Sequence, residues 1–171
     1  MVRQTHGLAP REDFISAMRR VAASVTVVTS DGPAGRAGAT VSAFSSVSAD
    51  PPTVLVCLAA QSRIAGVVQE NGRFCVNVLP EGFSDIADRF AGRHDAIVPD
   101  RFDGIEMFAP RGSAPVIDGA TAFQCGLQQV IRSGSHLILL GHVHSVLDGA
   151  APPLAYREGA YHRVVPHAHA G

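Results

Sequence analysis

Short runs of β-branched and other apolar residues recur along this chain, and clusters of Gly, Pro, Asp and Asn separate them. Three of these runs, residues 25–29, 53–58 and 74–79, have the length and composition of β-strands. The apolar spacing or flanking residues of a helix occur in only three short stretches: 13–23, 64–70 and 84–90. Because the strands do not alternate with long helices, a doubly wound parallel sheet is disfavoured. The pattern predicts a mostly β protein, a closed or nearly closed antiparallel barrel of about seven or eight strands.

The second half of the chain contains two longer runs of β character. Residues 122–131 and 136–147 are expected to form strands joined near Ser133-Gly134. By the two-residue period of a strand, one face of the second carries Leu137, Leu139, Val143 and Leu147. A last hairpin is expected over residues 156–164, with its turn at Glu158-Gly159.

Local signals also set several element ends. Asn71-Gly72 is expected to stop the helix of residues 64–70, and Ser84 is placed to cap the next helix. Residues 37–48 are expected to be extended, and residues 93–112 have no clear period and are expected to form a loop.

Length and composition limit the organisation and the partners. The 171 residues suit one domain, predicted over residues 11–165, with a flexible arm at 1–10 and a flexible tail at 166–171. With 14 basic and 15 acidic residues the chain has no positive excess for a phosphate backbone, so nucleic acid is not an expected partner. No apolar stretch is long enough to span a bilayer, and the first residues lack the apolar core of a signal peptide. We therefore expect a cytoplasmic protein that does not bind membranes.

The three cysteines agree with that location. Cys57, Cys75 and Cys125 are odd in number and form no Cys-x-x-Cys pair, so neither a disulfide framework nor a zinc ribbon is expected. They are interpreted as small buried apolar residues in a reducing compartment.

A hydroxyl-rich stretch, residues 38–48, is the first candidate for a binding site. It alternates small residues with Thr40, Ser42, Ser45, Ser46 and Ser48. Small side chains let a flat ring or a phosphate approach the backbone, and hydroxyls bond a ligand without fixed charge. Ser62-Arg63 precedes a helix whose N-terminus would attract an anion. Composition alone also allows a plainer reading, an edge strand with a solvated face and an ordinary helix cap.

The order of several motifs narrows this choice. The chain carries Thr-Val-Ser-Ala-Phe-Ser-Ser-Val-Ser-x-x-Pro-Pro from Thr40, then Ser62-Arg63, Phe90-Ala91-Gly92-Arg93, Asp100-Arg101-Phe102 and Gly134-Ser135-His136. In this order, over about residues 14–164, the chain resembles the flavin reductase family with the FMN-binding split-barrel fold. Members of this family are the small reductase components of two-component flavin monooxygenases.

The resemblance implies a fold, an activity and partners. The fold would be a split β-barrel with short helices, and the chain would form a homodimer. The activity would be that of an NAD(P)H:flavin oxidoreductase, with FMN or FAD as flavin and NADH or NADPH as co-substrate. The reduced flavin would reach a partner monooxygenase by diffusion.

The resemblance also implies roles for particular residues. Thr40, Val41 and Ser42 would hydrogen-bond the isoalloxazine edge and the ribityl chain, and His136 would lie near the nicotinamide, with Ser135 where the family has Asp. The complete set of implied cofactor-binding residues is Ala39, Thr40, Val41, Ser42, Ser45, Ser46, Val47, Ser48, Ser62, Arg63, Phe90 and Arg93. Of these, Ser62 and Arg63 would contact the phosphate, and Phe90 and Arg93 would close over the phosphate or adenosine side.

The chemistry of hydride transfer asks little of the protein. The hydride passes from the nicotinamide C4 to the flavin N5, so the cofactors carry the reaction and the protein stacks their rings. Backbone N–H groups can stabilise the charge that develops at flavin N1 and O2. His136 would place the nicotinamide carboxamide or donate a proton, and no acid–base pair is required.

Two other functions remain open at this point. His142 and His144 lie two residues apart, with His136 on the same strand face by parity, which loosely resembles the His-x-His pattern of metal-binding cupin barrels. The remaining cupin ligands have no counterpart at the required spacing, so no metal site is predicted. The second alternative is a flavin-binding protein without turnover, which would use the same pocket residues.

Overall fold

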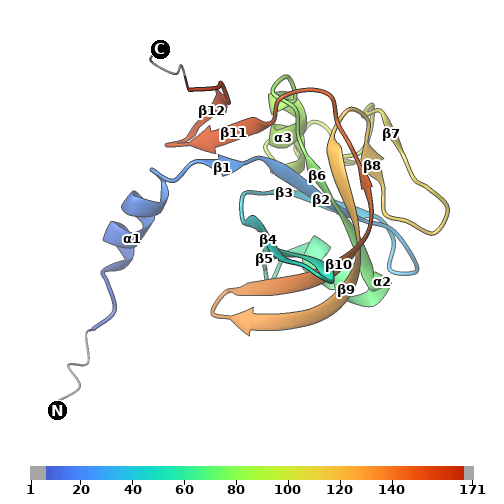
Figure 1. Cartoon of the computed structure of the whole chain (residues 1–171), viewed down its shortest axis with the longest axis horizontal. Helices are drawn as coiled ribbons and strands as arrows, with labels where there is room; N and C mark the ends of the chain where they lie inside the picture. Colours follow the sequence, from blue (N-terminus) through green and yellow to red (C-terminus); the bar gives the residue numbers. More distant parts are fainter. Residues whose placement is uncertain (1–6, 168–171) are drawn as a thin grey trace.

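The computed structural model of the protein describes residues 7–167 as three short helices and twelve strands (Figure 1). The helices are α1 (Arg11–Met18), α2 (Arg63–Asn71) and α3 (Ser84–Phe90). The strands of the first half are β1 (Ala23–Ser24), β2 (Thr26–Ser30), β3 (Ala37–Val41), β4 (Phe44–Ala49), β5 (Pro52–Ala59) and β6 (Arg73–Val78). Those of the second half are β7 (Met107–Phe108), β8 (Val116–Ile117), β9 (Thr121–Ser133), β10 (His136–Leu147), β11 (Leu154–Arg157) and β12 (Ala160–Arg163).

Seven strands form one antiparallel sheet in the order β3-β2-β6-β9-β10-β5-β4. The sheet curls on itself, but its two edge strands, β3 and β4, do not pair with each other, so the barrel stays open there. The mostly β fold and the split barrel predicted from the sequence are therefore confirmed. A second sheet, β1-β11-β12, and helix α1 project from one side of this barrel (Figure 1).

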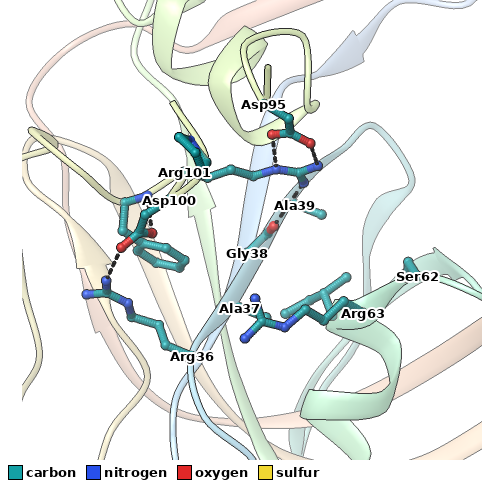
Figure 2. Close-up of a pocket in the computed structure, with 12 residues that line it drawn as sticks. Arg36, Ala37, Gly38, Ala39, Ser62, Arg63, Asp95, Asp100 and Arg101 are labelled. Atoms are coloured by element: carbon teal, nitrogen blue, oxygen red, sulfur yellow. Dashed lines mark hydrogen bonds and ion pairs between the residues drawn. The ribbon is translucent and has the colours of Figure 1, made fainter. Parts of the chain in front are cut away.

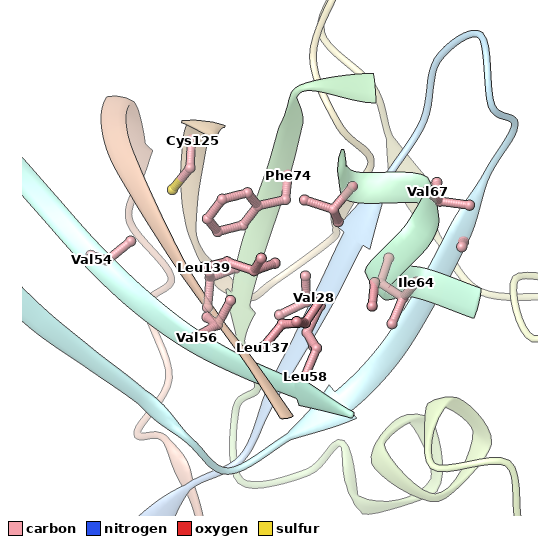
Figure 3. Close-up of a cluster of buried hydrophobic side chains, with 14 residues drawn as sticks. Val28, Val54, Val56, Leu58, Ile64, Val67, Phe74, Cys125, Leu137 and Leu139 are labelled. Carbon is pink, nitrogen blue, oxygen red and sulfur yellow. The ribbon is translucent and has the colours of Figure 1, made fainter. Parts of the chain in front are cut away.

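Helix α2 closes one end of the barrel with its apolar face. Ile64 and Val67 of α2 point into the interior, where they meet Val28, Phe74 and Leu139 from three strands (Figure 3). Every one of these side chains is at most 7% exposed. Because fully burying a side chain of this size contributes about 1.5–3 kcal/mol, this cluster is a main source of the stability of the barrel.

Strand β2 is buried on both faces. Val28 faces the barrel interior, whereas Val27 packs under α3 with Phe90, Phe102 and Leu79. All five residues of β2 are buried, which explains why its sequence shows a continuous β-branched run rather than an alternating pattern. This outer layer over β2 and β3 becomes one wall of the candidate site.

Most expected elements occur where the sequence placed them. Helix α2 ends at Gly72, which adopts a left-handed conformation with φ of 67°. The long hairpin β9–β10 turns at Gly134-Ser135, one residue after the expected position, and the last hairpin turns at Glu158-Gly159 as expected. The extended segment 37–48 is present, but a break at residues 42–43 divides it into β3 and β4.

Two helix predictions need correction. Helix α1 ends at Met18 rather than at residue 23, since the chain turns there and Ala23 enters β1 to pair with Tyr156 of β11. None of its residues is buried. Ser84 does not cap α3: it is the first helical residue, the cap position is Phe83, and no side-chain cap bond forms.

The predicted face of β10 is also partly wrong. Leu137, Leu139 and Val143 belong to the barrel interior as expected. The register against β9 then shifts between Val143 and Ser145, which moves the following residues to the opposite side. Leu147 consequently packs outside the barrel, against the small cluster that contains Cys75 and Val116.

The predicted arm and tail are covered only in part. Residues 1–6 of the arm and 168–171 of the tail lie outside the described residues. Within residues 7–167, no helix has the length and apolar character needed to cross a bilayer.

Candidate functional site

A cavity of about 660 Å³ lies between strand β3, the start of helix α2 and the loop of residues 95–102 (Figure 2). This volume falls in the range of about 300–1,000 Å³ typical of small-molecule sites. The residues that line the cavity are Arg36, Ala37, Gly38, Ala39, Ser62, Arg63, Ile64, Asp95, Pro99, Asp100, Arg101 and Phe102.

The floor of the cavity is the small-residue part of β3. Gly38 lies directly over the buried Phe90 ring, and a Cβ atom there would come within 2.6 Å of Phe90 Cε1. Only glycine fits at this point without moving an aromatic side chain that is fully buried. The residues Ala37, Gly38 and Ala39 line the cavity, and their small side chains let a ligand come close to this strand.

The start of α2 offers a site for an anion. Ser62 occupies the cap position, but its hydroxyl donates to the Ala59 carbonyl at 2.7 Å and does not cap the helix. The first N–H groups of the helix are thus left without a side-chain partner, next to the cavity. Arg63 is exposed and forms no ion pair with any residue from 7 to 167. A helix N-terminus beside a free guanidinium suits a phosphate group.

The loop wall is held in place by Arg101. Its guanidinium makes two hydrogen bonds to Asp95, of 2.6 and 2.8 Å, and donates to the Phe90 carbonyl at 2.9 Å. The hydrogen bonds from Arg101 lower the pKa of the Asp95 carboxyl, and the same pair raises the pKa of Arg101. Arg101 also donates to the Gly38 carbonyl at 3.4 Å, and these four hydrogen bonds make it a fixed part of the wall.

A second pair stands at the other end of the loop. Arg36 donates to Asp100 at 3.0 Å, and its guanidinium lies 4.3 Å from the centre of the Phe102 ring. Three arginines against two aspartates leave the lining with one positive charge. The cavity therefore favours an anionic ligand, with charge and N–H donors concentrated near Arg63.

Three of the predicted cofactor-binding residues line this cavity: Ala39, Ser62 and Arg63. Thr40 and Val41 point elsewhere, because the Thr40 hydroxyl donates to the Ala87 carbonyl at 2.7 Å and Val41 packs on the barrel core. These two can reach a ligand only through their backbone. Ser42 is exposed at the end of β3, where it lines a separate groove with α1 and Tyr156.

The residues predicted on β4 lie along the open edge of the barrel. Ser45, Ser46, Val47 and Ser48 are all exposed. The Ser45 hydroxyl donates to the Ser46 carbonyl, and the Ser48 hydroxyl donates to the Asp50 carbonyl. None of these four residues lines the cavity. Their contact with a flavin, which would be with its isoalloxazine ring, stays a prediction.

Phe90 and Arg93 do not lie over the cavity as expected. The Phe90 ring is fully buried behind Gly38, and it supports the floor instead of covering a ligand. Arg93 pairs with Asp88 at 2.9 Å, and Tyr161 of β12 donates to the same Asp88 oxygen at 2.5 Å. Asp88 raises the pKa of Arg93, and desolvation, followed by the bond to Asp88, raises the pKa of Tyr161 to about 12. This cluster holds the last hairpin against α3.

His136 is exposed at the start of β10. Its Nδ1 atom lies 3.0 Å from the Ser135 hydroxyl. It pairs with Ala59 across the sheet, and Ala60 donates to the Ser135 carbonyl at 2.9 Å. His136 is thereby tied to the short segment that leads into Ser62 and Arg63. It does not line the cavity itself, and its role at the nicotinamide stays a prediction.

The two histidines of the metal alternative lie in an irregular part of β10. His142 pairs with Gly126, and the His144 ring covers the same glycine, at 2.6 Å from the position of a Cβ there. In the part of the chain that the structure describes, no group of three or more His, Cys, Asp or Glu is placed to hold a metal ion.

The loop residues of the cavity were missed by reasoning from the sequence. Asp100, Arg101 and Phe102 carry part of the family resemblance, but no role was expected for them, and Arg36 and Asp95 were not singled out. The available signal was the concentration of Arg and Asp in a segment without helical or strand period.

The sequence matches the family described as flavin reductase like domain over residues 18–164. It is 39% identical to the FMN reductase (NADH) RutF of Ancylobacter novellus over 156 residues, which cover 90% of this chain and 85% of that protein. Among solved structures, the NADH:FAD oxidoreductase SgcE6 of Streptomyces globisporus is 27% identical, with a TM-score of 0.83 over 99% of this chain and 98% of the other. A homologue of nitrilotriacetate monooxygenase component B from Mycobacterium thermoresistibile is 29% identical, with a TM-score of 0.83 over 91% and 87% of the two chains.

Proposed function

The chain belongs to the flavin reductase-like family, and from this we propose that it is an NAD(P)H-dependent flavin oxidoreductase, which reduces FMN or FAD and supplies the reduced flavin to a partner monooxygenase. The observation that carries the proposal is the cavity beside the small-residue strand β3, with the free Arg63 and the start of α2 at one side. Its volume and its single excess positive charge fit the phosphate-bearing part of a flavin nucleotide.

The residues present suggest how the flavin is held. Arg63 and the first N–H groups of α2 would hold the phosphate, and the backbone of Ala39, followed by Ser42, would contact the ribityl chain. The exposed hydroxyls of β4, at the open edge of the barrel, would then contact the ring. When bound, the flavin supplies the redox chemistry and accepts the hydride from NADH or NADPH.

The protein's own contribution is binding and orientation. Neutral hydroxyls and backbone groups hold the ligand near the barrel edge without a covalent link, which suits a flavin that must leave after reduction. His136, steadied by Ser135, is proposed to place the nicotinamide carboxamide, so that the two rings stack at reacting distance.

We also propose that the protein is a homodimer. Phe14, Met18 and Val21 on and after α1 are 60%, 50% and 54% exposed, and they line an apolar groove of about 490 Å³ with Ser42 and Tyr156. Such a surface on projecting elements favours cover by a second copy of the chain. Light scattering of the purified protein tests this, and a monomer at micromolar concentration would refute it.

The proposed partner and compartment follow from similar arguments. A relative named as component B of a monooxygenase supports delivery of reduced flavin to a monooxygenase. The three cysteines are all free thiols, which agrees with a location in the reducing cytoplasm: Cys57, Cys75 and Cys125.

The decisive experiment measures NADH and NADPH oxidation by the purified protein with FMN, FAD or neither. Turnover that depends on added flavin is expected, and it identifies the preferred pair of cofactors. The Arg63→Met variant should bind both flavins more weakly, whereas Arg111→Met, an exposed arginine outside the cavity, should behave as wild type. Flavin binding without oxidation of either nucleotide would instead establish the flavin-binding protein without turnover.

A further inference from the structure

We propose that the Arg36 end of the cavity is a subsite for the adenosine diphosphate half of a dinucleotide, with the adenine stacked on the Arg36 guanidinium. The inference rests on the proposed function, because it takes the phosphate position at Arg63 as its starting point. It adds a specificity-determining residue and the chemical group that this residue recognises.

The cavity extends beyond the place where a single phosphate would sit. Arg63 and Ser62 stand on one side of the β3 segment Ala37–Ala39, and Arg36 stands on the other (Figure 2). A flavin mononucleotide ends at its one phosphate and would leave the Arg36 side unfilled. A second phosphate and a nucleoside would continue over the Ala37–Ala39 backbone towards Arg36.

Arg36 is held flat by a rigid aromatic support. Its guanidinium lies 4.3 Å from the centre of the Phe102 ring, and Phe102 meets Phe90 edge to face at 5.0 Å between centroids. Phe102 is 8% exposed and Phe90 is fully buried, so this support is fixed in the core. The Arg36 side chain is 44% exposed. A planar guanidinium with one face on an aromatic ring presents its other face for stacking on a base.

Arg36, just before β3, is less fully engaged than Arg101 and keeps N–H groups that can bind an anion. It makes a single 3.0 Å hydrogen bond to Asp100, whose side chain is 58% exposed. Arg101 differs, because it is engaged by two bonds to Asp95 and one to the Phe90 carbonyl. Arg36 and Arg63 are therefore two available cations on the two sides of one cavity, an arrangement that suits two linked phosphates.

Both FAD and NAD(P)H carry an adenosine diphosphate group, and the test separates these two sources. Dissociation constants for FMN, FAD and ADP are measured by calorimetry for the wild type, Arg36→Ala, Arg36→Lys and Asp100→Asn. The KM for NADH is measured with saturating FMN. Circular dichroism confirms that each variant is folded.

If the subsite binds the adenosine diphosphate group of FAD, Arg36→Ala should raise the dissociation constants of FAD and ADP about fivefold or more. The dissociation constant of FMN should then change less than about twofold. Arg36→Lys keeps the charge but not the flat surface, and it should recover only part of the loss. Asp100→Asn keeps Arg36 and removes its carboxylate partner, so FAD should bind at least as tightly as to the wild type. If the subsite binds the adenosine diphosphate group of NADH, Arg36→Ala should raise the KM for NADH and weaken ADP binding, and the binding of FMN and FAD should not change.

The proposal is overturned if Arg36→Ala weakens FMN binding as much as FAD binding. It is also overturned if the variant changes none of the dissociation constants of ADP and FAD and the KM for NADH. These outcomes differ from a failure of the proposed function. In that case the wild type itself would show no flavin-dependent oxidation of NADH or NADPH, whatever the variants bind.

Discussion

Replacing Gly38 by alanine is expected to destabilise the protein, because the new methyl group has no room. The Cβ would lie 2.6 Å from Phe90 Cε1, 2.8 Å from Phe90 Cδ1 and 3.1 Å from Phe102 Cζ. Both rings are buried and packed edge to face, so neither can turn aside without opening the layer under α3. The methyl group must instead push β3 towards the cavity.

The size of the effect follows from two opposing contributions. Overpacking of this kind costs about 1–3 kcal/mol. The alanine also lowers the conformational entropy of the unfolded chain, which returns about 0.4–1 kcal/mol. We expect a net loss of about 1–2 kcal/mol in the free energy of unfolding. Urea unfolding followed by circular dichroism measures it, since the chain has no Trp to report by fluorescence.

Gly66→Ala is the matched control. Gly66 lies on the exposed side of α2, where an added Cβ meets no atom within 4 Å. Alanine there should raise stability by about 0.5–1 kcal/mol, because it is the better helix former. A Gly38→Ala protein as stable as the wild type, beside a stabilised Gly66→Ala protein, would refute the argument that Phe90 and Phe102 form a rigid support. In a double-mutant cycle of Gly38→Ala and Phe90→Leu, the argument is supported if the double mutant loses less stability than the sum of the two single mutants.

Three further predictions concern the site and the buried thiols. Ser42→Val should weaken flavin binding by about 1 kcal/mol, or about fivefold, without unfolding the protein, and unchanged affinity by titration would show that Ser42 lies outside the flavin site. His136→Ala should raise the KM for NADH and leave the dissociation constant of the flavin unchanged, whereas loss of flavin binding would contradict its assignment to the nicotinamide. Burial raises the pKa of the Cys125 thiol from 9.0 to about 12 and raises that of Cys75 as well. Because the folded state holds these protons more tightly than the unfolded chain, their stabilising effect is complete below pH 9.0 and is lost as the pH rises to about 12. The urea midpoint should fall across that window, and Cys125→Ala should reduce the fall; an equal slope in this variant would show that other groups cause it.

The elements that the sequence predicts well are those with local signals at their ends. Helix α2 has an amphipathic run and a glycine that takes the left-handed conformation at its end, with φ of 67°. The turns at Gly134-Ser135 and Glu158-Gly159 likewise contain glycines with positive φ. Such signals act within a few residues, so they can be found without knowledge of the fold.

The elements predicted wrongly are those set by distant partners. The apolar period of α1 continues through Val21, but pairing of Ala23 with Tyr156 makes the chain extended there. The register shift in β10 has no local marker, and it places Leu147 on the face opposite to the one that its position in the alternation predicts. Tertiary pairing overrides the local preference in both cases.

The site shows the same division. Ala39, Ser62 and Arg63 are found through motifs that are continuous in the sequence. Arg36 and Arg101 are missed, since their positions come from contacts between distant segments, such as the hydrogen bonds of Arg36 to Asp100 and of Arg101 to the Phe90 carbonyl. A basic residue in a loop has no pattern that reveals such a partner.

The anchoring of the loop by Arg101 has a consequence for how this protein could diversify. The Arg101 guanidinium closes the loop on itself at Asp95 and ties it to Phe90 at the end of α3, so residues 96–99 between these anchors carry little of the structure of the barrel. That segment can accept substitutions and small insertions while the strands below keep their register. New ligand preferences can thus arise by drift in a few loop positions, with the barrel itself left intact.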